Sequence, residues 1–174
     1  MELTLKDFER AAKRLEGIIH KTELDYSSTF SNMAGGEVWM KCENRQKTGS
    51  FKIRGAANKI GALLERGELN AVVASSAGNH AQGVALAATR RGIKSIVCMP
   101  DGAPIMKVEN TKNLGAEVCL VPGTYDDAHD KAVELQEETG MTFIHPYDDE
   151  QVIAGQGTIG LEILCLLYTS DAAD

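Results

Sequence analysis

The stretch Thr48-Gly49-Ser50-Phe51-Lys52-Ile53-Arg54-Gly55-Ala56 contains an amine placed for chemistry. A glycine turn precedes an expected helix, and Lys52 falls in the first turn of that helix. Ser50 is a candidate N-cap, because its side-chain oxygen can accept from a free amide of the first turn. The positive end of the helix dipole disfavours the charged form of a lysine there, and imine chemistry needs an uncharged amine. The alternative is a solvated surface lysine.

A second candidate site is the loop Ser75-Ser76-Ala77-Gly78-Asn79-His80-Ala81-Gln82-Gly83, between an expected strand and the helix after it. Gly78 permits a close approach of backbone to a ligand. The helix N-terminal amides and the serine hydroxyls are donors suited to a carboxylate or phosphate. Asn79 can donate a neutral hydrogen bond to a phenolate or carbonyl oxygen. The alternative is that these residues only cap the helix.

A third motif is a literal G-x-G-x-x-G at Gly155-Gln156-Gly157-Thr158-Ile159-Gly160. A dinucleotide fingerprint requires a strand directly before the glycines and an acidic residue about 20 positions later. The preceding residues are loop-like, so we interpret the motif as chance or as tight helix packing. The four histidines show no ligand spacing, and we predict no metal site.

Composition restricts the class of protein. The 174 residues are 43% hydrophobic and 25% charged, and the net charge of −7 argues against nucleic-acid binding. No apolar run is long enough to cross a bilayer, and the N-terminal residues carry no secretion signal. Cys42, Cys98 and Cys119 fall in apolar runs without a C-x-x-C pair. We therefore expect buried, reduced thiols in a cytoplasmic protein.

The hydrophobic pattern predicts the elements that position these motifs. An amphipathic helix spans Leu5 to Ile19, an irregular polar stretch runs from His20 to Ser31, and Val38–Cys42 is a strand. The Lys52 helix ends near Gly67. From residue 70 the chain alternates strands and helices; the strands are 71–75, 95–99, 117–121 and 142–144, and the helices are 79–90, 104–114, 126–138 and 151–164. This alternation predicts a parallel sheet, whose ligands bind at the carboxyl ends of the strands.

These motifs together resemble the threonine/serine dehydratases. The resemblance rests on Lys41-Cys42-Glu43-Asn44 to Ala56, Ser75 to Ala85, Met99 to Val118 and His145-Pro146-Tyr147-Asp148 to Leu164, and it covers residues 1–164. It implies an α/β fold of the pyridoxal-phosphate (PLP) fold type II, shared with the tryptophan synthase β subunit. The short catabolic threonine dehydratases are the most similar members.

The resemblance implies roles for individual residues. Lys52 would bind PLP covalently and take the α-proton of the substrate, Phe51 would pack against the cofactor ring, and Asn79 would hydrogen-bond the 3′-oxygen. The substrate-carboxylate loop would comprise Ser75, Ser76, Ala77, Gly78, Asn79 and His80. L-threonine, and in some members L-serine, would be the substrate, and 2-oxobutanoate and ammonia the products. Lys47, Thr48 and Gln82 would bind an AMP-type effector, and the full-length protein would be a homo-oligomer.

The resemblance also implies a domain organisation. Residues 1–65 would begin the large domain, 66–150 would form an inserted small parallel α/β domain, and 151–164 would return to the large domain. Residues 165–174 look like a translated sequencing adaptor, so we expect a non-native tail and a truncated gene. The glycine-rich loop for the cofactor phosphate would lie beyond residue 174. We therefore expect this piece by itself to be inactive.

Four alternatives stay open. A serine racemase of the same fold would carry a serine before Gly-Asn-His as a second acid/base, whereas this chain has Ala77. A β-replacement enzyme would share the fold. A nucleotide-binding oxidoreductase fragment would use Gly155–Gly160. An inert binding module would have no reactive lysine.

Overall fold

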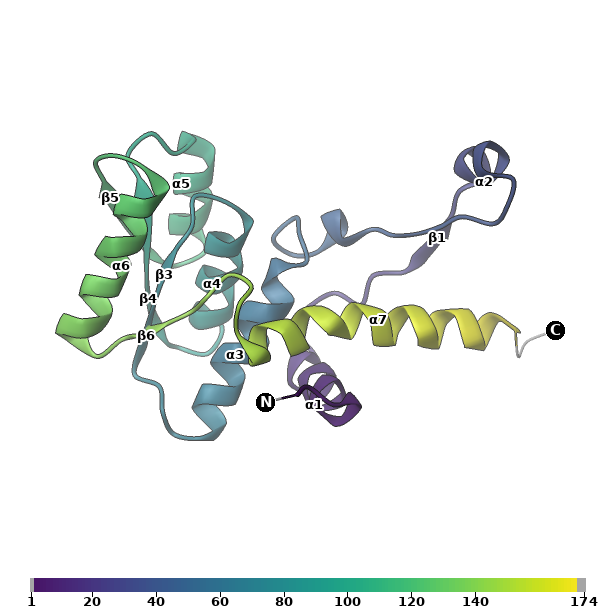
Figure 1. Cartoon of the computed structure of the whole chain (residues 1–174), viewed down its shortest axis with the longest axis horizontal. Helices are drawn as coiled ribbons and strands as arrows, with labels where there is room; N and C mark the ends of the chain where they lie inside the picture. The colour runs from purple at the N-terminus through teal and green to yellow at the C-terminus, as the bar shows by residue number, and fades with distance from the viewer. Residues whose placement is uncertain (1, 172–174) are drawn as a thin grey trace.

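The alternating strands and helices of the middle of the chain form one four-stranded parallel sheet, as predicted (Figure 1). The computed structural model describes residues 2–171, with side chains through residue 167. The strand order is β5-β4-β3-β6. The strands are β3 (Ala71–Ser75), β4 (Lys94–Pro100), β5 (Glu117–Val121) and β6 (Thr142–Phe143). Val73 pairs with Ile96, and Val97 with Val118.

Helices cover both faces of this sheet, because successive strand residues point to opposite sides. α4 (Asn79–Thr89) and α5 (Ile105–Asn113) cover one face, where Val97 packs with Ala85. α6 (Tyr125–Thr139) covers the other face, where Cys98 packs with Ala132. Pro104 is the N-cap of α5, and Gly140 ends α6 in the left-handed conformation. The carboxyl ends of β3 and β4 therefore open toward the N-termini of α4 and α5.

Three helices form the second part of the structure, beside α4 (Figure 1). They are α1 (Leu5–Leu15), α3 (Lys52–Glu65) and α7 (Glu150–Asp171). α3 and α7 approach closely, since a Cβ atom on Gly155 would lie 2.6 Å from the Arg54 carbonyl oxygen. A Cβ atom on Gly157 would collide with the ring of Phe8. The three glycines of the G-x-G-x-x-G motif thus lie inside a helix, and two of them, Gly155 and Gly157, permit tight helix packing.

The prediction that residues 20–31 are irregular is wrong. β1 (Leu24–Tyr26) pairs antiparallel with β2 (Trp39–Lys41), and α2 (Ser28–Ala34) lies between them. The Ser27 hydroxyl caps α2 by accepting from the Phe30 amide at 3.3 Å. Figure 1 shows these elements as an arm that carries α2 at its far end. A three-residue strand has too few positions to show a period, so its partner strand determines it.

The last helix does not end at Leu164. α7 continues from Glu150 to Asp171, because Cys165-Leu166-Leu167 contains neither glycine nor proline to stop it. Residues 172–174 lie outside the described residues. The foreign origin of residues 165–174 stays a prediction.

Two further features concern the broad class of the protein. Between residues 2 and 171, no helix has both the length and the apolar character needed to cross a membrane. Cys42, Cys98 and Cys119 are free thiols, and Cys98 is fully buried. Burial raises the pKa of Cys98 to about 12, so its thiol stays protonated at neutral pH.

Candidate active site

The lysine singled out from the sequence opens α3. The N-cap is Phe51 rather than Ser50, so the helix begins one residue later than expected. The Ser50 hydroxyl still accepts from the Lys52 amide, at 3.4 Å. Lys52 is therefore held at a defined helix start by its own backbone, with its side chain free to extend from the helix.

The Lys52 side chain is half-buried between two neighbours. Its Nζ atom donates to the Pro146 carbonyl oxygen at 2.8 Å and lies 5.5 Å from the centroid of the Phe51 ring. Burial lowers the pKa of Lys52 below its ordinary value. The direction agrees with the expectation from the sequence, but the cause is burial rather than the helix dipole. A lysine with a lowered pKa is a better nucleophile and base at neutral pH.

Lys52 lies on the wall of a cavity of about 470 Å³. Phe51 is 40% exposed and Tyr147 68% exposed, so two aromatic rings border an open space. The full lining is Phe8, Phe51, Lys52, Pro146, Tyr147, Ile153, Gln156 and Gly157. A planar aromatic ligand with an aldehyde could stack on such a wall while Lys52 reacts with it.

The second candidate loop approaches Lys52 through α4. A Cβ atom on Gly83 would lie 3.1 Å from the Lys52 carbonyl group, so glycine allows α4 to touch the start of α3. His80, in the first turn of α4, is near enough that the charge of Lys52 helps to lower its pKa. The two motifs, more than 20 residues apart in sequence, therefore lie on neighbouring helix starts.

The remaining loop residues have varied environments. Ser75 is fully buried at the end of β3, and its hydroxyl has no partner among the described residues. Ser76 accepts from the Gly78 amide at 3.2 Å. Asn79 is exposed, and its Oδ1 atom accepts from Lys107 Nζ at 3.1 Å. None of Ser75, Ser76 and Asn79 lines the Lys52 cavity, so the structure does not bring the Asn79 amide onto it.

The three effector candidates, Lys47, Thr48 and Gln82, also differ. Lys47 Nζ donates to the Ile18 carbonyl at 2.6 Å. Partial burial and the charge of Arg90 lower the pKa of Lys47. Thr48 is buried, and the Gln82 side-chain nitrogen has no partner in the described part of the chain.

His80 is a neutral, buried imidazole. It is 3% exposed, and Nε2 lies 2.8 Å from the Ile144 carbonyl oxygen, which can only accept, so Nε2 carries the hydrogen. Burial lowers the pKa of His80 from 6.5 to about 4. The His80 ring takes up a proton near pH 6.5 in the unfolded chain and near pH 4 in the folded chain. Above pH 6.5 the ring is neutral in both states, so it causes no pH-dependent loss of stability there. As the pH falls from 6.5 toward 4, stability is lost at about 1.4 kcal/mol per unit.

We expect an NMR titration of the His80 ring in the folded protein to give a midpoint near 4. The free energy of unfolding should fall between pH 6.5 and 4, and His80→Gln should flatten that part of the curve. His80→Gln is a suitable comparison because an amide can still donate to the Ile144 carbonyl oxygen. A His80 midpoint near 6.5, or an equal pH dependence in both proteins, would contradict this prediction.

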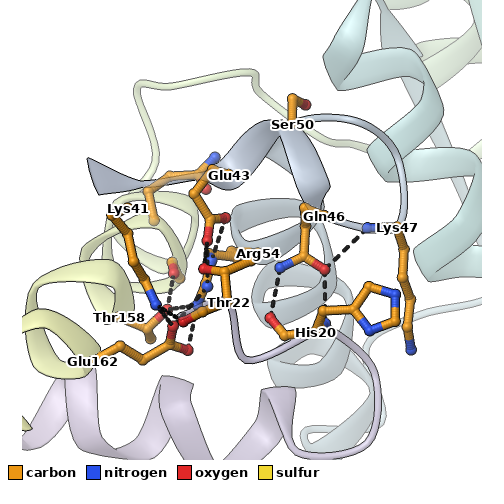
Figure 2. Close-up of polar contacts among 12 residues, drawn as sticks. His20, Thr22, Lys41, Glu43, Gln46, Lys47, Ser50, Arg54, Thr158 and Glu162 are labelled. Atoms are coloured by element: carbon orange, nitrogen blue, oxygen red, sulfur yellow. Dashed lines mark hydrogen bonds and ion pairs between the residues drawn. The ribbon is translucent and has the colours of Figure 1, made fainter. Parts of the chain in front are cut away.

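A buried ion network ties the segment before Lys52 to α3 and α7, and the sequence analysis did not identify it (Figure 2). Arg54 is fully buried and binds two carboxylates, each through two hydrogen bonds. Its nitrogens donate to Glu43 at 2.7 and 2.8 Å and to Glu162 at 2.7 and 2.9 Å. Lys41 Nζ lies 2.6 Å from Glu162, and the Thr22 hydroxyl donates to Glu43 at 2.6 Å. Two cations and two carboxylates thus balance inside the protein.

Each charge in this network depends on the others. Burial alone would raise the pKa of Glu43 and of Glu162, but hydrogen bonds from Arg54 hold both pKa values below their usual range. Burial would lower the pKa of Arg54, but its hydrogen bonds to the two carboxylates raise it instead. A signal was present in the sequence: Arg54 lies beside the apolar helix stripe that includes Ile53 and Ala57 and is flanked by small residues at Gly55 and Ala56. A buried charge beside such a stripe requires a partner.

In the part of the chain with described side chains, no three or more His, Cys, Asp or Glu residues gather as a metal site. The dinucleotide alternative lacks its structural context, because Gly155–Gly160 lies inside α7 rather than directly after a strand.

The fold and the lysine-bearing cavity define a class of enzyme. The chain belongs to the pyridoxal-phosphate dependent enzyme family, whose model matches residues 15–173. The predicted membership of the pyridoxal-phosphate dependent enzymes is thereby confirmed, and the parallel sheet with helices on both faces confirms the predicted α/β fold.

Several individual proteins are also similar to this chain. The chain is 54% identical to an L-threonine ammonia-lyase of Thermotoga maritima, over 93% of this chain and 40% of that protein. The solved threonine deaminase of T.th. superposes with a TM-score of 0.89 at 42% identity, over 97% of this chain and 53% of that one. Maize serine racemase superposes with a TM-score of 0.89 at 38% identity, over 94% and 50%. The chain spans about half the length of the curated relatives it matches.

Proposed function

We propose that the full-length protein is a PLP-dependent lyase that converts L-threonine to 2-oxobutanoate and ammonia. The proposal rests on the Lys52 amine, which lies on the cavity wall beside Phe51 and whose pKa is lowered by burial. The name of the 54% identical relative supports threonine as the substrate. L-serine, which has the same β-hydroxyl group, is the second substrate to test.

The residues of this chain fit the cofactor. Lys52 would bind PLP through its amine, and Phe51 presents an exposed ring face against which the pyridine ring could stack. PLP, when bound, supplies the electron sink that stabilises negative charge at the substrate α-carbon. The freed Lys52 amine would take the α-proton, since its lowered pKa leaves more of it uncharged. Departure of the β-hydroxyl as water, followed by hydrolysis, gives the keto acid and ammonia.

The substrate carboxylate would bind at Ser75, Ser76, Ala77, Gly78, Asn79 and His80. The amides at the start of α4 and the unpartnered buried hydroxyl of Ser75 support an anion there. Asn79 would donate to the 3′-oxygen of PLP, although its side chain does not line the Lys52 cavity itself. Its Oδ1 atom already accepts from Lys107, so its Nδ2 hydrogens are the ones available to donate.

A serine racemase or a β-replacement enzyme is the second candidate, and the superposition on maize serine racemase favours including it. Racemisation needs a proton donor on the opposite face of the substrate, and Ala77 has no ionisable group. We therefore favour elimination. Chiral analysis of serine recovered after incubation distinguishes the two, because D-serine would support the racemase.

The decisive experiment incubates the full-length protein with PLP and L-threonine and measures 2-oxobutanoate. Borohydride reduction followed by peptide mapping then locates the cofactor. We expect 2-oxobutanoate and a label on Lys52. No keto acid, or a label on another lysine, would overturn the proposed function.

Three further properties belong to this proposal. Residues 66–150 form the small domain, between 1–65 and 151–164 of the large domain.

An AMP-type nucleotide binds at Lys47, Thr48 and Gln82, and the proximity of Lys47 to Arg90 supports an anionic effector. The full-length protein is a cytoplasmic homo-oligomer; the free thiols of Cys42, Cys98 and Cys119 support the compartment, and the exposed Tyr26 and Trp39 support an interface.

A further inference from the structure

The loop that delivers Phe51 and Lys52 has no regular structure of its own. This loop, residues 46–51, joins the short helix η1 (Glu43–Arg45) to α3 and consists of turns and bends. The ion pair between Glu43 and Arg54 closes it at its base. An irregular loop with closed ends still has internal freedom, so something else must fix its path.

Gln46 fixes that path through its side-chain amide (Figure 2). Its Nε2 atom donates to the His20 carbonyl oxygen at 2.7 Å, and its Oε1 atom accepts from the His20 amide at 2.7 Å. The same Oε1 atom accepts from the Lys47 amide at 3.1 Å. Gln46 is only 4% exposed. The amide thus pairs with a backbone residue as a neighbouring strand would, in a place where water does not compete.

The segment that receives Gln46 is itself fixed. His20 follows the end of α1, where the Ile18 and Ile19 amides donate to the carbonyl oxygen of the buried core residue Leu15. Lys47 Nζ donates to the Ile18 carbonyl oxygen at 2.6 Å, beside the Gln46 contact. The loop is therefore attached to a rigid support.

We infer that Gln46 is a positioning residue for Lys52: by pairing with His20, it holds loop 46–51 so that Phe51 and Lys52 enter the cavity. The inference rests on the proposed function of Lys52. Without the pairing, the loop gains conformations in which Lys52 leaves the Pro146 carbonyl oxygen and meets water. A reacting group displaced by about 1 Å loses on the order of 10²-fold in rate.

The test uses Gln46→Met in the full-length protein, because methionine has a similar length and makes none of the three hydrogen bonds. Two quantities are measured: the pH dependence of Lys52 labelling by an amine reagent in the cofactor-free protein, and the kcat and KM for threonine. We expect the Lys52 labelling midpoint to rise toward its ordinary value and kcat to fall by about 10²-fold.

Two comparisons separate positioning from loss of stability. Leu135→Ala removes a partly buried α6 side chain on the sheet face away from α3, so it should lower the melting temperature while leaving labelling and kcat unchanged. Gln46→Asn keeps an amide but is one methylene shorter, so it can make at most part of the pairing and its effects should be smaller than those of Gln46→Met. This milder variant also provides the test if Gln46→Met does not fold.

The outcomes are distinct. A shifted Lys52 midpoint in the Gln46 variants, absent in Leu135→Ala, supports the inference. Gln46 variants that lose stability but keep the wild-type midpoint and kcat overturn it. If the unaltered protein places no PLP on Lys52 and makes no 2-oxobutanoate, the proposed function fails instead, while the labelling midpoint still reports whether Gln46 controls Lys52.

Discussion

Replacement of Lys52 by alanine should abolish covalent PLP binding and lower kcat for threonine deamination by about 10³-fold or more in the full-length protein. Alanine has neither an amine to bond the cofactor nor a base for the α-proton. The change should leave the fold intact, because the Lys52 side chain makes a single hydrogen bond among the described residues, to the Pro146 carbonyl, at the edge of an open cavity. Borohydride reduction with peptide mapping measures the first loss, and 2-oxobutanoate formation measures the second.

Lys59→Ala is the matched control. Lys59 lies in the same helix, and its ammonium group pairs with Asp149 at 2.5 Å, away from the Lys52 cavity. We expect this variant to keep the cofactor and to retain kcat within about twofold. The Lys59–Asp149 pair, whose side chains are 15% and 21% exposed, lies outside the cavity lining, so its loss should affect stability rather than the reaction. A Lys52→Ala protein that still forms 2-oxobutanoate at the wild-type rate would remove Lys52 from the mechanism.

The regular half of the fold could be predicted from the sequence because its signals are local. β3 and β5 have the predicted bounds, 71–75 and 117–121, since each is a short, largely apolar run with a polar or glycine residue within two positions of either end. β1 could not be predicted, because Leu24-Asp25-Tyr26 becomes a strand only by pairing with Trp39–Lys41, 13 to 17 residues away. The likeness of residues 165–171 to an adaptor sequence predicts an end of the helix at Leu164, whereas their helix propensity lets α7 continue to Asp171.

In the candidate site, too, local sequence signals predict some features and not others. Lys52 stands at a helix start that the turn residues before it indicate. By contrast, the partners of Arg54 lie 11 and 108 residues away along the chain, so no sequence window contains both. Gln46 resembles any polar loop residue until His20 is placed against it. Long-range polar pairing sets the geometry around Lys52, and such pairing leaves almost no periodic trace in one sequence.

Arg54→Met should be among the most destabilising single substitutions in the chain, by about 3–5 kcal/mol. The arginine is fully buried, and its removal leaves Glu43 and Glu162 with only Lys41 to balance them. A buried carboxylate without its partner loses its hydration and gains no compensating hydrogen bonds. Arg54→Met/Glu162→Met should recover part of the loss, because one ammonium group and one carboxylate then remain inside.

The pH dependence distinguishes this explanation from simple loss of packing. In the wild-type protein, Glu43 and Glu162 have lowered pKa values, so their contribution is complete above the unfolded pKa and is lost as the pH falls. Without Arg54 their pKa values rise, and the penalty eases as protonation neutralises them. The difference in unfolding free energy between wild type and Arg54→Met should therefore shrink from pH 7 to pH 4.

Lys112→Met, which breaks an exposed pair with Glu109, is the control and should change stability by less than about 0.5 kcal/mol. If Arg54→Met lowers the free energy of unfolding by no more than Lys112→Met does, or by the same amount at pH 7 and pH 4, then the buried ion pairs do not hold α3 to α7.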